Sequence, residues 1–97
     1  MRIVTKKHIV DFYQKHAGSK TALEDWYIKV SKLDFQNLNE LRIFFPSADY
    51  VGNERVVFNI KGNYYRLIAI VIYVSKKVYI RWIGTHAAYD KINAKAC

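Results

Sequence analysis

The spacing of the apolar residues changes once along this chain, and the only proline, Pro46, stands near the change. Before Pro46 these residues recur three or four positions apart, as they do on one face of an α-helix. From Val56 they recur two positions apart, as they do on one face of a β-strand. The sequence therefore predicts an α+β fold in which helices cover one face of an antiparallel sheet and leave the other face to meet a ligand.

The part of the chain before Pro46 is predicted to hold one short strand and three helices. Gly18 would stop the first helix, and Ser19 or Thr21 would cap the second. Pro46 would end the third helix, because proline has no N–H to donate. The predicted elements are a strand over residues 2–5 and helices over residues 6–17, about 20–33 and 38–45.

The part after Pro46 is predicted to hold three strands and a short terminal helix. Gly62 and Asn63 would form a two-residue hairpin turn. Residues 64–74 are rich in Ile, Val and Tyr, which is typical of a central strand covered on both faces. Thr85 would cap the terminal helix. The other predicted elements are strands over residues 56–61 and 78–84 and a turn over residues 75–77, and residues 1–97 are predicted to form a single domain.

The chain carries 16 Lys and Arg against 8 Asp and Glu, which gives a formal net charge of +8 at pH 7. The excess lies mostly in the second half, because residues 51–97 hold eight of the basic residues but only two acids, Glu54 and Asp90. Such an excess attracts phosphate groups or anionic lipid. A membrane-surface role is disfavoured, since these charges fall on strands and turns rather than along one amphipathic helix.

Several classes of enzyme lose support because their motifs are missing. Cys97 is the only cysteine, so the chain has no internal disulfide and no Cys/His zinc set, which fits a cytoplasmic protein. The sequence also lacks a phosphate-binding glycine loop, an H-E-x-x-H pair and a nucleophile elbow. It shows no signal peptide and no apolar run long enough to span a bilayer. We therefore expect no metal, no cofactor and no membrane.

Two arginines of the predicted strands, Arg66 and Arg81, are candidates to bind a phosphate. If their strands pair, the two guanidinium groups lie close on one sheet face with Lys61 at the hairpin end. Two such groups repel each other unless an anion lies between them, and their planar shape matches phosphate oxygens. The alternative is that each arginine lies along the surface or pairs with Glu54 or Asp90.

Aromatic and titratable residues surround these arginines. Exposed Tyr and Trp on a sheet can stack on unpaired bases, although such residues more often belong to the core. Just past the last strand, His86, Tyr89 and Asp90 fall within five positions. They could transfer protons at a phosphodiester, or they could simply form the capped start of a helix.

Two blocks of the chain closely resemble the HigB family of toxins from bacterial type II toxin-antitoxin modules. The first is N-x-x-R-L-I-A at residues 63–69, and the second is I-x-T-H-x-x-Y-D at residues 83–90. Upstream, residues 38–49 match the family's short helix that ends before a proline. Together with the segments around them, these blocks extend the resemblance over most of the chain.

The resemblance implies a RelE-like fold and a ribosome-dependent endoribonuclease that cuts translated mRNA without a metal. In related toxins the ribose 2′-hydroxyl attacks the adjacent phosphate, which leaves a 2′,3′-cyclic phosphate and a 5′-hydroxyl. The implied partners are the ribosome, mRNA and a HigA-type helix-turn-helix antitoxin, through which alone the toxin would meet DNA. The alternative is a non-catalytic RNA-binding or ribosome-binding module that uses the same basic aromatic face.

The resemblance also suggests roles for individual residues. Arg66 is the candidate to hold the scissile phosphate, with Arg81 as a second candidate. Either His86 or Tyr89 would transfer the proton, and Asp90 would orient the group or cap the helix. Further candidates for contact with RNA or phosphate are Lys61, Asn63, Tyr64, Lys76, Lys77 and Lys91.

Overall fold

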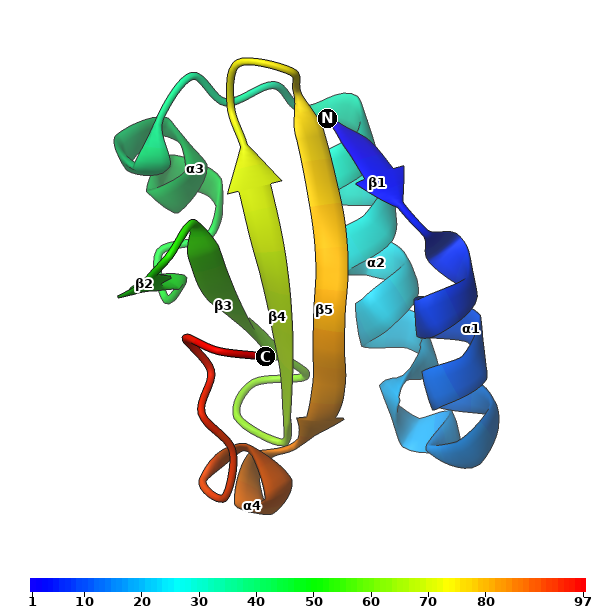
Figure 1. The fold of residues 1–97 in the computed structure, drawn as a ribbon. Helices are drawn as coiled ribbons and strands as arrows, with labels where there is room; N and C mark the ends of the chain where they lie inside the picture. The colour runs from blue at the N-terminus through cyan, green and yellow to red at the C-terminus, as the bar shows by residue number, and fades with distance from the viewer.

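A five-stranded sheet forms the centre of the protein, and two helices cover one of its faces (Figure 1). The computed structural model describes all residues, 1–97. The strand order across the sheet is β1-β5-β4-β3-β2. The elements in chain order are β1 (Arg2–Val4), α1 (Lys6–Lys15), the 3₁₀ turn η1 (Ala17–Ser19), α2 (Lys20–Lys32), α3 (Leu38–Phe44), β2 (Asp49–Gly52), β3 (Arg55–Ile60), β4 (Tyr65–Ile72), β5 (Lys77–Thr85) and α4 (His86–Tyr89).

The predicted α+β class is confirmed, but the sheet is mixed rather than antiparallel. β1 runs parallel to β5, with Ile3 opposite Val78, whereas every other neighbouring pair is antiparallel. The physical reason is the long connection between β1 and β5. A parallel neighbour cannot be joined by a tight turn, and here the intervening chain builds the rest of the protein before β5 returns beside β1.

β2 was missed by the sequence analysis although Gly52 and Asn53 at its turn repeat the Gly-Asn pair of the predicted hairpin turn. β2 pairs with β3 through a reversal in which Asn53 and Glu54 have φ angles of 56° and 65°. Glutamate rarely adopts this left-handed conformation. The strand is also short and lies at the edge of the sheet, so its side chains show no buried alternation.

The core lies between the sheet and the helices α1 and α2. Helix α2 buries Leu23, Trp26 and Val30 against the sheet, and the Trp26 ring meets Phe58 with centroids 5.2 Å apart. Burial of such apolar side chains is the main stabilising contribution to a domain of this size. The sheet residues in the same cluster are Val56, Phe58, Ile60, Leu67, Ala69, Val71, Val78 and Ile80.

Several helix boundaries differ from those predicted. α1 ends at Lys15, and the chain then turns through η1, which contains Gly18. Ser19 does not cap α2 with its side chain, because it is fully buried and its hydroxyl donates to the carbonyl of His16 at 2.7 Å. Thr85 does cap α4, as predicted, and accepts from the Ala88 N–H at 3.1 Å.

The β3–β4 and β4–β5 turns are each four residues long. Ile60 stands opposite Tyr65, so the first turn spans residues 61–64 rather than Gly62 and Asn63 alone. Ile72 stands opposite Lys77, so the central strand is shorter than residues 64–74. The predicted two-residue turn nevertheless implies the same register, because it also places Ile60 opposite Tyr65.

An irregularity in β5 decides which residues face away from the helices. Ile68 pairs with Trp82 and Ala69 pairs with Ile80, so Arg81 is an extra residue in the ladder. Beyond this bulge Arg66 stands opposite Gly84, and the Trp82 ring lies over Gly84. We call the sheet face that carries Arg66, Trp82 and Gly84 the open face.

None of the helices is long and apolar enough to cross a membrane.

Replacing Gly84 with alanine tests this packing. A Cβ at Gly84 would overlap the Trp82 ring, so the Gly84→Ala variant must push the ring aside. Overpacking of this kind costs about 1–3 kcal/mol, and we expect a melting temperature lower by roughly 5–15 °C. Thermal unfolding followed by circular dichroism measures the change, and an unaltered melting temperature would show that the ring moves freely.

Candidate active site

Arg66 lies at the centre of a polar group built by the β3–β4 hairpin. The antiparallel register places Asn59 of β3 directly opposite Arg66 of β4. Arg66 Nη1 donates to Oδ1 of Asn59 and, at 2.6 Å, to Oδ1 of Asn63 in the turn. The guanidinium group is therefore held by two neutral amide oxygens, one from a strand and one from the turn that follows it.

Tyr89 of α4 covers the other side of this group. Its ring centroid lies 5.5 Å from Cζ of Arg66, within the range of a cation–π contact. Trp82 packs beside Tyr89, with ring centroids 6.2 Å apart. The helix that carries Tyr89 is fastened to the hairpin because the His86 N–H donates to the Tyr64 carbonyl at 3.0 Å. The hairpin and α4 thus bring Arg66 and Tyr89 together.

These side chains border a polar cavity of about 330 Å³. One wall comes from β3, β4 and α4, and the other comes from α3 and the segment that leads into β2. The cavity contains two arginines, Arg42 and Arg66, and one carboxylate, Asp49. The lining residues are Arg42, Pro46, Ser47, Ala48, Asp49, Val57, Asn59, Arg66 and Tyr89.

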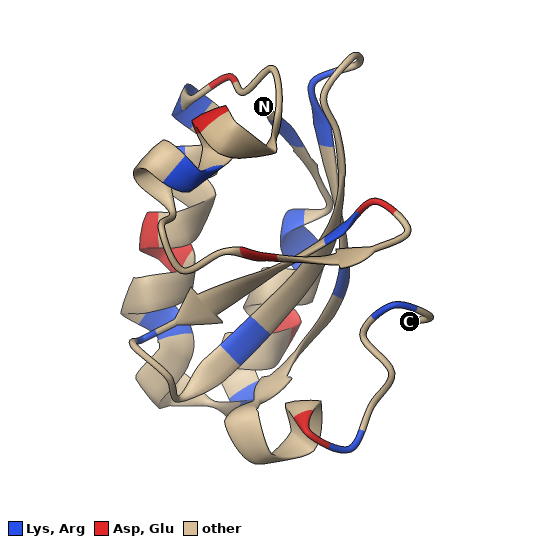
Figure 2. Ribbon diagram, turned by 90° about the vertical axis from the view of Figure 1, so that its left-hand side faces the viewer, with Lys and Arg blue, Asp and Glu red and all other residues tan.

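The basic side chains of the molecule are not neutralised by its own carboxylates. Lys and Arg lie on helices and strands alike (Figure 2), and no Lys or Arg nitrogen comes within 4.0 Å of an Asp or Glu side-chain oxygen. The one ion pair present joins the Met1 amino group to Asp34 at 3.3 Å, and His86 Nε2 lies 3.7 Å from a carboxylate oxygen of Asp90. The alternative in which Arg66 or Arg81 pairs with Glu54 or Asp90 is therefore wrong.

The phenol of Tyr89 is held in its protonated form. Burial raises the pKa of Tyr89 above its usual value, and the nearby negative charge of Asp49 raises it further. Arg66 opposes this shift, while Asp90 and Cys97 add to it. At neutral pH Tyr89 is thus a proton donor beside a fixed positive charge.

Arg81 does not share the cavity of Arg66. Its Nε donates to the main-chain oxygen of Cys97 at 3.4 Å, and Arg55 donates to the same oxygen at 2.6 and 2.8 Å. Arg81 lines a different cavity, against His8 and Lys15 of α1. The expectation that Arg66 and Arg81 stand together around one anion is therefore wrong. The bulge in β5 is the reason, because it breaks the simple alternation on which that expectation rested.

The remaining predicted residues lie at both ends of the sheet, some near Arg66 and some far from it. At the β3–β4 turn, Lys61 Nζ lies 5.5 Å from the Tyr64 ring centroid, and Tyr64 is 71% exposed. Lys91 lies two residues after the end of α4. Lys76 and Lys77 lie at the opposite end of β4 and β5, where Lys76 Nζ donates to the Phe35 carbonyl at 3.1 Å. The structure therefore gathers the first three near the Arg66 end and leaves the last two apart from it.

His86 occupies the first position of α4 but does not line the cavity of Arg66. Its Nε2 lies 3.7 Å from Asp90 Oδ2, and its Nδ1 is buried without a hydrogen-bond partner. Tyr89, three positions later, does line the cavity. Of the two candidates for proton transfer, Tyr89 is the one that the fold brings to Arg66.

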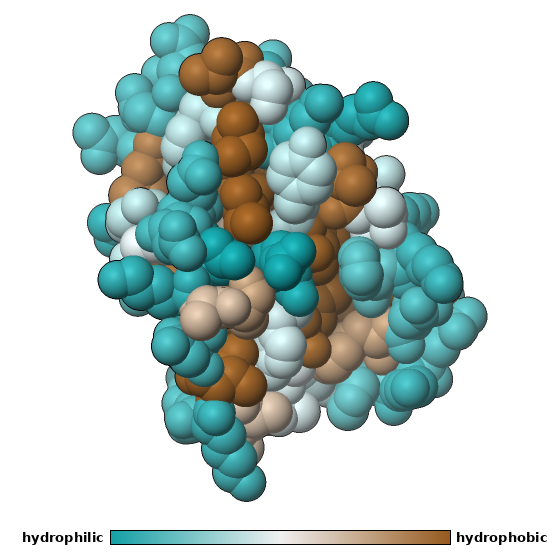
Figure 3. Space-filling view, viewed as in Figure 1, coloured by the Kyte–Doolittle hydropathy of each residue, from teal (hydrophilic) through white to brown (hydrophobic).

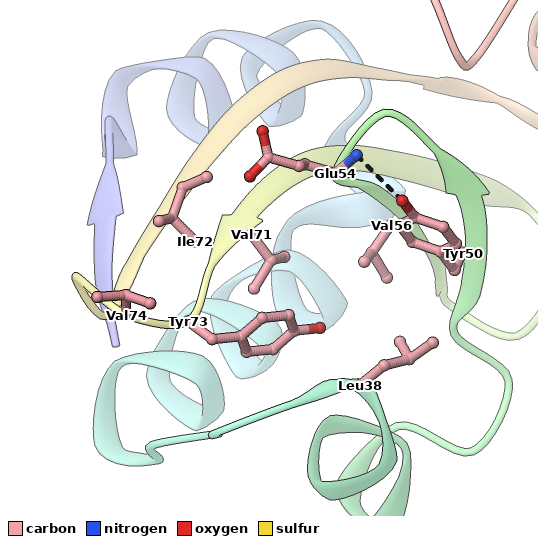
Figure 4. A pocket seen from close by; sticks show the side chains of 8 residues that line it. All are labelled: Leu38, Tyr50, Glu54, Val56, Val71, Ile72, Tyr73 and Val74. Atoms are coloured by element: carbon pink, nitrogen blue, oxygen red, sulfur yellow. Dashed lines mark hydrogen bonds between the residues drawn. The ribbon is translucent and has the colours of Figure 1, made fainter.

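A second, larger cavity of about 360 Å³ is apolar and lies between α3 and the far ends of β3 and β4 (Figure 4). Glu54 is its one charged residue, and the Glu54 N–H donates to the Tyr50 hydroxyl at 3.4 Å. Burial raises the pKa of Tyr73, which lines it, and Tyr50 adds to that shift. Apolar side chains are also exposed in the middle of the molecular face shown in Figure 3. A cavity without a cation does not suit phosphate chemistry.

The sequence analysis missed three charged or amide residues that line the polar cavity. Asn59 could have been found, because the predicted hairpin register already sets it opposite Arg66. Arg42 and Asp49 could not, because they reach the cavity only through the packing of α3 and the segment after Pro46 against the sheet. Local spacing carries no information about that packing.

Comparison with known proteins identifies the family of the chain. Residues 19–92 match the HigB toxin family, the RelE-like toxic component of a toxin-antitoxin system. The chain is 35% identical over 96 residues to the mRNA interferase toxin HigB of Escherichia coli, which covers 97% of this chain and 92% of that protein. The mRNA interferase HigB of Shigella flexneri matches to the same extent. That of a second Escherichia coli strain is 31% identical over 94 residues. This chain belongs to the HigB family of RelE-like toxins.

Proposed function

We propose that this toxin is an endoribonuclease that cuts translated mRNA on the ribosome. The observation that carries the proposal is Arg66, an unneutralised guanidinium in a polar cavity beside the protonated phenol of Tyr89. Relatives that are similar over nearly the whole chain are named mRNA interferases. Phosphodiester cleavage needs a cation that stabilises the negative charge of the phosphate oxygens and an acid that protonates the leaving oxygen.

In the proposed reaction the ribose 2′-hydroxyl of the mRNA attacks the adjacent phosphorus. The O2′–P bond forms and the P–O5′ bond breaks, which leaves a 2′,3′-cyclic phosphate and a 5′-hydroxyl. Arg66 would bind the phosphate oxygens, whose negative charge grows in the transition state. Tyr89 would give its proton to the departing O5′, and the proton of the 2′-hydroxyl would pass to a base at the ribosomal site or to solvent. No step uses a metal.

The ribosome is proposed to supply the positioning that so small a protein lacks. Around the cavity, Lys61, Asn63, Tyr64 and Lys91 would contact mRNA or ribosomal RNA. Lys76 and Lys77, at the far end of the sheet, and Arg81, beside α1, would hold more distant phosphates. Electrostatic binding of this kind weakens steeply with salt.

Membership of a toxin-antitoxin family gives the chain an antitoxin partner. We propose that this partner is of the HigA type, with a helix-turn-helix domain, and that the toxin meets DNA only through it. The proposed place of action is the cytoplasm, where mRNA is translated.

The uncompensated charge also supports a second candidate, a module that binds RNA or the ribosome without cutting. The 16 Lys and Arg side chains, none of which lies within 4.0 Å of an Asp or Glu side-chain oxygen, would suffice for such binding. The cavity with Arg66 and Tyr89 favours catalysis. Cyclic-phosphate ends on mRNA distinguish the two, because a binding module produces none.

Replacing Arg66 with alanine should abolish toxicity. An arginine that binds the transition-state oxyanion contributes about a hundredfold or more to the rate. We therefore expect Arg66→Ala, expressed without antitoxin, to permit growth, and the purified variant to cut ribosome-bound mRNA about a hundredfold more slowly. Arg2→Ala, on the far edge strand β1, is the matched control and should arrest growth as the wild type does. Undiminished arrest by Arg66→Ala would remove Arg66 from the mechanism.

Free RNA provides a test of ribosome dependence. Purified toxin should leave naked RNA largely intact and should cut the same mRNA within the ribosomal A site. The ends are identified by primer extension and by their resistance to ligation. Efficient cleavage of naked RNA would contradict the dependence on the ribosome.

The proton donor can be identified from the pH dependence of cleavage. A phenol with a raised pKa stays protonated until the pH passes the ordinary tyrosine value of about 10, so a Tyr89 donor predicts a rate that does not fall between about pH 6 and pH 9 for want of the acid. A donor imidazole would instead make the rate decline as the pH rises from about 5 to 8. Tyr89→Phe should lower the rate about a hundredfold, and His86→Ala much less. The opposite order would assign the role to His86.

A further inference from the structure

Arg66 is held in an unusual way for a residue that must bind an anion. Two hydrogen bonds leave the same nitrogen, Nη1, and both end on side-chain amide oxygens, those of Asn59 and Asn63. A guanidinium group has five N–H donors, of which Nη1 carries two. The two asparagines therefore use that nitrogen fully, while the structure shows no protein acceptor for Nε or Nη2 of Arg66.

The unused donors are the ones suited to a phosphate. Nε and Nη2 lie along one edge of the guanidinium plane and can bind two oxygens of one phosphate in parallel. Tyr89 lies at 5.5 Å from Cζ and restricts movement of the plane. With Nη1 fastened to β3 and to the turn, the direction of the opposite edge is set before any substrate arrives.

The charge of the acceptors matters as much as their position. A carboxylate at either position would fix Arg66 equally well, but it would also neutralise the guanidinium group and compete with the phosphate. Amide oxygens accept the same hydrogen bonds and leave the positive charge intact. No carboxylate oxygen comes within 4.0 Å of Arg66.

We propose that Asn59 and Asn63 are positioning residues that aim the Nε–Nη2 edge of Arg66 at the scissile phosphate without reducing its charge. This inference rests on the proposed function and adds the residues that orient its central cation. Preorganisation of this kind acts on the transition state, since a small misplacement of a catalytic group slows the chemical step more than it weakens binding.

The test compares Asn59→Ala, Asn63→Ala and Asn59→Asp with Asn39→Ala, an exposed asparagine of α3 that serves as the matched control. Single-turnover cleavage of ribosome-bound mRNA at increasing toxin concentration gives the maximal rate and the half-saturating concentration separately. We expect each alanine variant of the pair to lose about tenfold in maximal rate. Asn59→Ala should keep a half-saturating concentration and a melting temperature close to those of the wild type, whereas Asn63→Ala also removes a proposed contact with RNA and should raise the half-saturating concentration. Asn59→Asp should instead need a higher toxin concentration, because its carboxylate competes with the phosphate.

The result that overturns the inference is a maximal rate within twofold of the wild type for both alanine variants, or equal losses in the Asn39→Ala control. Wild-type behaviour of Asn59→Asp would overturn the requirement for a neutral acceptor. Rotation about the Cζ–Nη1 bond of Arg66, followed by ¹⁵N magnetic resonance, gives a readout that needs no cleavage, and it should be faster in Asn59→Ala. If the wild-type protein cut no mRNA, the proposed function would fail, while slow rotation would still show that the asparagines restrain Arg66.

Discussion

The pairing of β3 with β4 is the interaction on which the rest of the structure depends. One face of this hairpin supplies Phe58, Leu67 and their neighbours to the core beneath α1 and α2. The other face places Asn59 opposite Arg66. Because side chains alternate along a strand, the same register that buries the apolar set also assembles the polar group. A slip of one residue would move both sets to the wrong faces, so stability and function constrain each other here.

The polar cavity around Arg66 is formed by some residues that are close together in the sequence and by others that are far apart. The hairpin supplies the cation and its two acceptors within eight positions, whereas α3 and the segment after Pro46 close the opposite wall of the cavity. α4 links the two blocks of the family resemblance, since it brings Tyr89 of the second block onto Arg66 of the first. The proposed chemistry therefore lies where the C-terminal helix meets the hairpin.

Much of this arrangement could be predicted from the sequence, and what could not has a physical reason. Apolar spacing gave the fold class and the central hairpin, and the capping role of Thr85 follows from its side chain alone. The parallel position of β1 and the bulge at Arg81 depend on tertiary contacts that no residue type indicates. The edge strand β2 was missed because it is short and shows no buried alternation. Arg81 illustrates this limit. One extra residue in β5 changes the face on which the following side chains lie, so a prediction based on strict alternation placed Arg81 wrongly.

The lack of carboxylate partners for the basic side chains has a consequence for the protein when it is alone. With a formal net charge of +8 on 97 residues, like charges repel across a small surface and oppose the compact state. Any polyanionic surface that binds the folded chain relieves this repulsion and shifts the folding equilibrium in its favour. The isolated toxin is thus expected to be less stable than any complex in which a partner's negative charges lie against this surface.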